Sequence, residues 1–85
     1  MEKWFLVDSK KGDLFTKVLS AKNSSDAIQE ATTIWNSLSA FDRKQRDAFF
    51  VIYAEENEEG QPDYDLALIC IDLIDQFGNM VIATL

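Results

Sequence analysis

Carboxylates are the side chains whose number and spacing come closest to chemistry in this chain. Asp72 and Asp75 flank a predicted turn, and Asp63 and Asp65 point to the same side of a predicted strand start. Such pairs can hold Mg²⁺ or divide the roles of general acid and general base. Acids at strand ends also discourage edge-to-edge aggregation without any catalytic role. We favour this second interpretation, and a metal-dependent hydrolase using Asp72 and Asp75 is an alternative.

The residue types on which many enzymes depend are missing from the sequence. The chain has no histidine, which removes the commonest general base and metal ligand. Its three glycines fall in separate predicted turns, so they cannot form a phosphate-binding loop. The run Asp63-Tyr64-Asp65 lacks the downstream glycine and glutamate of a calcium loop. We therefore expect a protein that is not an enzyme and that uses no cofactor or metal ion.

Charge is distributed very unevenly along the 85 residues. Residues 1–46 carry eight Lys or Arg and six Asp or Glu, whereas residues 47–85 carry nine Asp or Glu and no Lys or Arg. An acidic half-chain repels the phosphate backbone, so direct binding of nucleic acid is not expected. Six of these acids form the candidate partner-binding acidic tip: Glu55, Glu56, Glu58, Glu59, Asp63 and Asp65. The acidic tip either keeps an apolar hairpin soluble or attracts a basic protein surface.

The acidic tip is predicted to be the loop of a long β-hairpin. Phe49–Tyr53 and Leu66–Leu73, which are rich in β-branched and aromatic residues, flank it, and Gly60 and Pro62 favour a reversal between them. We expect this hairpin to be the backbone of the only sheet. Further strands are predicted over Lys3–Ser9 and Leu14–Ala21, which form a first hairpin, and over Met80–Leu85 after a turn at residues 75–79.

Two helices are predicted between the hairpins. Asn23, Ser24 and Ser25 can each cap a helix whose apolar residues recur at spacings of three and four: Ala27, Ile28, Ala31, Ile34, Trp35 and Leu38. Ser39 followed by Asp42 predicts a second, short helix over Ala40–Asp47. The order is β-β-α-α-β-β-β. It predicts one α+β domain over residues 1–85, with an antiparallel sheet of about five strands and both helices on one face.

Both faces of this predicted sheet are apolar, which is unusual for an antiparallel sheet with one solvated side. We assume that Tyr53 pairs with Leu66 and Leu73 with Val81. One face then holds Phe50, Ile52, Ala54, Ala67, Ile69, Ile71, Leu73, Val81, Ala83 and Leu85. The other is the candidate self-association face: Phe49, Val51, Tyr53, Tyr64, Leu66, Leu68, Met80 and Ile82. The helix covers one face, and either the first hairpin or a second copy covers the other; we favour a homodimer.

A cytoplasmic location is expected from what the sequence lacks. The single cysteine, Cys70, cannot form an internal disulfide, so nothing indicates an oxidising compartment. The first residues do not read as a signal peptide. The longest apolar run, Ala48–Ala54, is far shorter than the roughly 20 residues of a membrane-spanning helix. No membrane association is therefore predicted.

One segment resembles a group of known sequences. Its pattern runs from Ala27 through Trp35-x-x-Leu38, Asp42-Arg43-x-x-Arg46 and Phe49-x-Val51, and Asp63-Tyr64-Asp65 follows. This pattern is similar to that of short uncharacterised proteins of gut Firmicutes and their mobile elements, which have no assigned activity. The resemblance implies a cytoplasmic bacterial protein, and it transfers no functional residue.

Three functions are compatible with the sequence. The favoured hypothesis is a small acidic, non-catalytic protein-interaction module that self-associates through its apolar sheet face. The second is a DNA mimic that inhibits a nucleic-acid-binding enzyme of host defence, because small acidic proteins of mobile elements sometimes act in this way. The third is the metal-dependent hydrolase.

Overall fold

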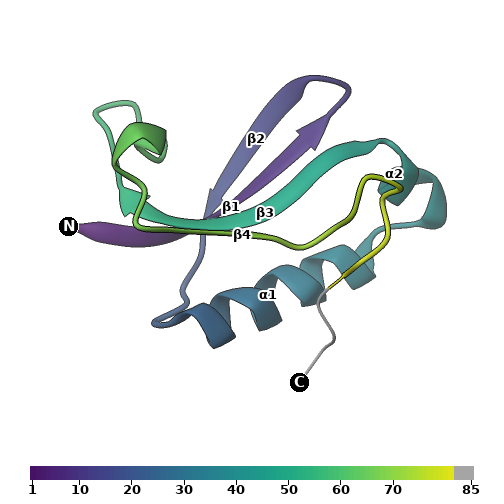
Figure 1. Ribbon diagram of the computed structural model, residues 1–85, viewed down its shortest axis with the longest axis horizontal. Coiled ribbons are helices and arrows are strands. Elements are labelled where there is room, and N and C mark those ends of the chain that lie inside the picture. The colour runs from purple at the N-terminus through teal and green to yellow at the C-terminus, as the bar shows by residue number, and fades with distance from the viewer. Residues whose placement is uncertain (82–85) are drawn as a thin grey trace.

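A four-stranded antiparallel sheet with one long helix along it forms the fold (Figure 1). The computed structural model describes residues 1–81. The elements are β1 (Glu2–Lys10), β2 (Asp13–Val18), α1 (Ser24–Ser37), α2 (Ala40–Lys44), β3 (Arg46–Glu55), the 3₁₀ helix η1 (Tyr64–Leu66) and β4 (Ile69–Asp72). Their order across the sheet is β2-β1-β3-β4. The predicted α+β class is confirmed, with four strands among the described residues instead of about five.

The end of the chain accounts for part of this difference. The predicted turn at residues 75–79 is present, and the Asp75 side chain accepts hydrogen bonds from the backbone N–H groups of Phe77 and Asn79. The backbone N–H of Val81 donates to the carbonyl of Leu73 at 3.0 Å, so the predicted pairing of these two residues is confirmed. The remainder of the predicted last strand, residues 82–85, lies outside the described residues.

β1 and β3 are the two central strands, and they pair along the whole length of β1. The predicted first hairpin is therefore not an addition at the margin of the sheet, because β1 lies at its centre. A two-residue turn of Lys11 and Gly12 connects β1 to β2, and both residues have positive φ angles (51° and 87°). This backbone follows the right-handed twist of the paired strands, and glycine adopts it without strain.

The predicted register of the second hairpin is wrong. Tyr53 pairs with Ile69 and not with Leu66, because η1 takes up three residues between the two strands. A shift by an odd number of residues turns every side chain of a strand to the opposite face. Ile69, Ile71 and Leu73 therefore lie on the same face as Phe49 and Val51, and not on the face of Phe50 and Ile52.

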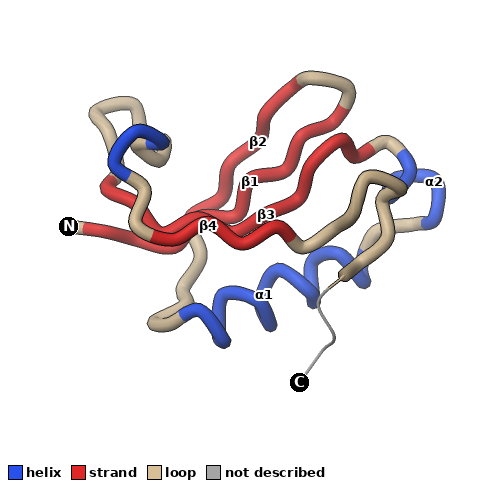
Figure 2. The backbone as a smooth tube through the Cα atoms, in the orientation of Figure 1, coloured by secondary structure: helices blue, strands red, loops and turns tan. Residues whose placement is uncertain are grey.

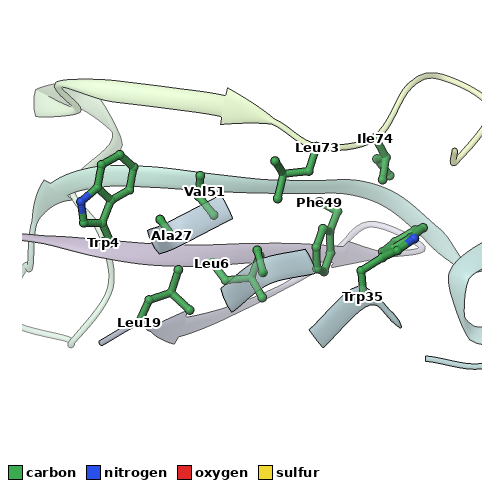
Figure 3. Packing of buried hydrophobic residues seen from close by; sticks show 10 residues of the cluster. Trp4, Leu6, Leu19, Ala27, Trp35, Phe49, Val51, Leu73 and Ile74 are labelled. Carbon is green, nitrogen blue, oxygen red and sulfur yellow. The ribbon is translucent and has the colours of Figure 1, made fainter. Parts of the chain in front are cut away.

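α1 covers the face that carries Phe49 and Val51. Asn23 caps the helix by accepting a hydrogen bond from the N–H of Asp26 at 2.8 Å. Figure 3 shows side chains of the sheet and of α1 pointing into one shared layer. Its fully or almost fully buried members are Trp4, Leu6, Leu19, Ala27, Ala31, Trp35, Phe49, Val51, Leu73 and Ile74. The predicted apolar stripe of α1 is confirmed as the part that packs on the sheet.

The opposite face is buried without a second helix. Phe5, Val7, Ile52 and Ala54 are each at most 2% exposed there. The loop after β3 and η1 lies on the side of the sheet away from α1 (Figure 2). Its buried Pro62 and half-buried Ala67 add apolar cover, and Ala67 packs against these four side chains. The central strands thus bury their side chains on this face within a single chain, whereas Leu14 and Val18 of β2 stay exposed on it.

Candidate interaction surface

The acidic tip is not a row of equivalent solvated carboxylates. The Glu55 carboxylate lies 3.3 Å from the N-terminal ammonium group of Met1, and that of Glu56 lies 3.0 Å from Nζ of Lys3. Asp63 caps η1, because its side chain accepts a hydrogen bond from the N–H of Asp65 at 3.1 Å. Three of the six acids thus have partners within the chain. Glu58, Glu59 and Asp65 are exposed.

The loop that carries the acidic tip folds back on itself and does not project as an extended finger. Oδ1 of Asn57 accepts hydrogen bonds from the backbone N–H groups of Glu59 and Gln61, which closes the turn. The hydroxyl of Thr16 on β2 donates to Oε1 of Gln61 at 2.5 Å. This contact ties the loop to the strand at the far edge of the sheet, so the side chains of Asn57 and Gln61 hold the loop over the second apolar face.

The candidate self-association face is divided between the interior and the surface. Phe49 and Val51 are buried beneath α1 (1% and 0% exposed), so the prediction that they lie on an open face is wrong. Tyr53 and Met80 are half-buried against the same core. Ile82 lies outside the described residues. There are two physical reasons: α1 packs on the face of Phe49 and Val51, and the register shift at η1 separates the residues that precede β4 from those of β3.

The remaining three residues of that prediction are exposed, and so is Ile69, which follows them in sequence and was assigned to the other face. We name this group the η1 patch. Its members and their exposed fractions are Tyr64 (45%), Leu66 (59%), Leu68 (63%) and Ile69 (42%). Partial burial raises the pKa of the Tyr64 phenol above its ordinary value. Asp63 and Asp65 flank the first member of the η1 patch, Tyr64, and the last member, Ile69, is the first residue of β4.

The carboxylate pairs considered for catalysis have structural contacts. One oxygen of Asp75 accepts two backbone hydrogen bonds in the turn that follows β4, and Asp63 caps η1. Asp72 lies on the outer strand β4 and is exposed. Within residues 1–81, no three acidic or cysteine side chains come together closely enough to hold a metal ion. The geometry of the described residues therefore offers no observation that favours the hydrolase.

The basic group Arg43-Lys44-x-Arg46 also has mainly structural contacts. The guanidinium of Arg43 donates to the carbonyls of Trp35 and Asn36 at the end of α1, at 3.1 and 3.3 Å. Arg46 pairs with Asp8 at 2.8 Å and donates to the carbonyl of Asp42. Lys44 is exposed. Two of the three cations are thus used to hold the helices and strands of their own chain in place.

The comparisons with known proteins give no family. No family model matches the chain, and no curated protein or solved structure is significantly similar to it. The resemblance to short proteins of gut Firmicutes stays a prediction. In the part of the chain that the structure describes, neither helix combines the length and the apolar content needed to cross a membrane.

The outer edge of β4 is a feature that sequence reasoning missed. A single strand was predicted over Leu66–Leu73, whereas β4 has only the residues Ile69–Asp72. Cys70 is exposed on it, and partial burial together with the nearby Asp72 carboxylate raises the pKa of its thiol. A lone cysteine in an apolar strand run is usually a small buried core residue, and the expectation that Cys70 is one is therefore wrong. The signal that pointed to an outer position was Asp72 itself, the one charged residue of an otherwise apolar run.

Proposed function

We propose that this protein is a non-catalytic protein-interaction module that binds its partner through the η1 patch. The observation that supports the proposal is the presence of four large apolar side chains within residues 64–69, each at least 42% exposed. Scattered single apolar residues are normal at protein surfaces, but contiguous apolar patches often mark interaction sites. The side chains that β1 and β3 contribute to the two apolar clusters are buried within the chain, so the η1 patch is not a remnant of an uncovered core.

The chemistry around the η1 patch indicates the kind of partner surface that fits it. Asp63 and Asp65 flank Tyr64, and residues 47–85 contain no Lys or Arg. A complementary surface has an apolar centre and a basic rim, because like charges opposite one another disfavour association. A single cysteine and no disulfide are consistent with a cytoplasmic setting. A second copy of the chain does not supply such a rim from its own acidic half.

Affinity capture from a lysate of the native host tests the proposal. The wild type is compared with the double variant Leu66→Ser/Leu68→Ser, in which the apolar centre of the η1 patch is removed. The matched control is Phe41→Ser/Phe77→Ser, which removes two even larger apolar side chains that are 71% and 78% exposed elsewhere on the surface. We expect a protein that the wild type and the control retain and the patch variant loses. Equal retention by all three chains would contradict the proposal.

The DNA-mimic inhibitor is the alternative hypothesis. It requires several acids of the tip to remain available to a basic protein, and Glu58, Glu59 and Asp65 are exposed. The pairing of Glu55 and Glu56 with cations of the same chain weakens this hypothesis. The variant Glu58→Gln/Glu59→Gln distinguishes the two functions. It should weaken the partner's binding if charge mimicry is the function, and it should leave binding through the η1 patch largely unchanged.

A further inference from the structure

The outer side of β2 has no strand beside it in the part of the chain that the structure describes (Figure 1). The described chain ends at the opposite margin of the sheet, where the N–H of Val81 donates to the carbonyl of Leu73, just past β4. From Leu73, the outer side of β2 lies four strand spacings away across the sheet, roughly 19 Å. The four residues after Val81 span at most about 14 Å when fully extended, so they are too short to reach it. This margin is therefore open to a strand of another chain.

Three residues of β2 direct their backbone hydrogen-bonding groups away from β1. The N–H of Leu19 donates to the carbonyl of Trp4 at 2.8 Å, and the antiparallel register continues from this pair along β2. Successive residues of an antiparallel strand point these groups to alternate sides, so those of Val18, Thr16 and Leu14 face outward. Within residues 1–81, no hydrogen bond uses the outward N–H groups or carbonyls of these three residues. They are free to pair with a neighbouring strand.

The side chains of β2 take little part in the core. Neither of the two buried clusters includes a described residue of this strand, and Leu14, Phe15 and Val18 are 59%, 56% and 45% exposed. Asp13 and Lys17 are also exposed, and no ion pair within residues 1–81 includes either of them. A lysine on an outer strand usually discourages pairing, so a strand that joins β2 must offer Lys17 an opposite charge.

Antiparallel pairing of β2 with β2 of a second copy supplies that charge in one register. When Phe15 lies opposite Phe15 of the other copy, Lys17 of each copy lies opposite Asp13 of the other. The same register pairs Leu14 with Thr16, so that outward-facing backbone groups meet outward-facing groups. Sliding the strands by two residues in either direction leaves Asp13 without a lysine opposite it. The sequence of β2 is thus complementary to itself in charge and in backbone direction.

We propose that this chain forms a symmetric dimer through antiparallel pairing of its two β2 strands. The pairing joins two four-stranded sheets into one, with α1 of both copies on the same face. Phe15 lies on that face, because the register aligns it with Asp8 and Phe49. The two Phe15 rings therefore meet at the two-fold axis, and an Asp13–Lys17 pair lies on either side of them. The interface is isologous, so it closes in a dimer.

The dimer does not involve the η1 patch, so this inference stands apart from the proposed function. The paired segment, residues 13–17, is short, and it buries less than the roughly 800 Å² per partner of a standard interface. Association should therefore depend on protein concentration. The double variant Leu66→Ser/Leu68→Ser, which tests the proposed function, should dimerise like the wild type.

Reversal of charge tests the register in solution. Light scattering measures the mass of the wild type as protein concentration rises, and we expect a change from monomer to dimer. Lys17→Asp places an acid opposite Asp13 of the other copy and should keep the chain monomeric over the same range. The double variant Asp13→Lys/Lys17→Asp exchanges the two charges and should restore the dimer. The control Lys22→Asp makes the same change of net charge at an exposed residue beyond β2 and should dimerise like the wild type. A wild type that stays monomeric at every concentration, or an equal loss of dimer in Lys22→Asp, would overturn the proposal.

Disulfide trapping tests the position of the two-fold axis. Cys70 is exposed and is first replaced by serine. Phe15→Cys then places one cysteine on each side of the axis, and the Cα atoms of a directly opposed, non-hydrogen-bonded pair are about 4.5 Å apart, which a disulfide can span. Val18→Cys is the control, because Val18 is similarly exposed and the same register separates its two copies by about 20 Å along the strands. Under mild oxidation, Phe15→Cys should form a covalent dimer much faster than Val18→Cys. Equal rates in the two variants would indicate random collisions and would overturn the proposal, as would the lack of a covalent dimer from Phe15→Cys.

Discussion

Nε of Arg46 lies 2.8 Å from Oδ1 of Asp8, and this ion pair joins the first residue of β3 to a residue near the C-terminal end of β1. Both side chains are mostly buried, at 12% and 19% exposure. Beside the pair, the register of the two strands shifts between Ser9 and Lys10. The ion pair therefore connects the two central strands at the point where their regular hydrogen bonding is interrupted. It also explains a charged residue directly after the apolar run Trp4–Val7 of β1.

Removing one member of this pair should destabilise the protein. Asp8→Asn or Arg46→Gln leaves the other charge partly buried and without its partner, and we expect each change to lower the free energy of unfolding by about 1–3 kcal/mol. Urea denaturation of both variants and of the double variant measures the coupling. The loss of unfolding free energy in the double variant should be clearly smaller than the sum of the losses in the two single variants. Strict additivity would mean that the two residues do not interact.

Arg43 should stabilise the end of α1. Its guanidinium donates to the carbonyls of Trp35 and Asn36 and lies 5.8 Å from the centre of the Trp35 ring. Cations near a helix C-terminus interact favourably with its partial negative charge. We expect Arg43→Ala to lower the free energy of unfolding by about 1–2 kcal/mol, as measured by chemical denaturation. Lys44→Ala, one residue further along and exposed, is the control and should change stability very little. Equal losses of stability in both variants would contradict a stabilising role of Arg43 at the end of α1.

Phe49 and Leu66 were predicted on the same open face, but replacing them should have very different effects on the free energy of unfolding. Phe49 is 1% exposed and packs against Trp35, with ring centres 4.9 Å apart. Phe49→Ala should cost about 3–5 kcal/mol because it leaves a cavity beneath α1. Leu66 is 59% exposed, and Leu66→Ala should stay within about 0.5 kcal/mol. Chemical denaturation measures both, and a small cost at Phe49 would contradict the assignment of the helix-covered face.

The thiol of Cys70 should react more slowly than that of a free cysteine at mildly alkaline pH. Partial burial and the Asp72 carboxylate raise its pKa, so a smaller fraction is thiolate at a given pH, and the thiolate is the reactive form. Asp72→Asn removes the second of these causes. Its thiol pKa should fall towards the ordinary value, and its rate of alkylation by iodoacetamide at about pH 8 should rise. Asp65→Asn is the control, and an equal rise in both variants would show that Asp72 has no specific effect.

Local patterns in the sequence were sufficient to predict much of the secondary structure. The cap at Asn23, the apolar stripe of α1 and the turn around Asp75 all depend on contacts between residues only a few positions apart. The short helix after Ser39 follows from the same kind of local signal, although it ends at Lys44 and not at Asp47. Such features are set by capping, periodicity and turn geometry, which the sequence displays directly.

The sequence by itself determined that this is an acidic α+β chain with two apolar sheet faces and no histidine. Only the tertiary structure decided which face each residue occupies. The three residues of η1 shift the register of β4 by an odd number, and no local signal distinguished this from a continued strand. α1 packs on the face of Phe49 and Val51 and buries them, and the shift leaves the η1 patch outside the paired strands and largely exposed. Tertiary packing likewise decided that Asp8 and Arg46, distant in sequence, form an ion pair across the central strands.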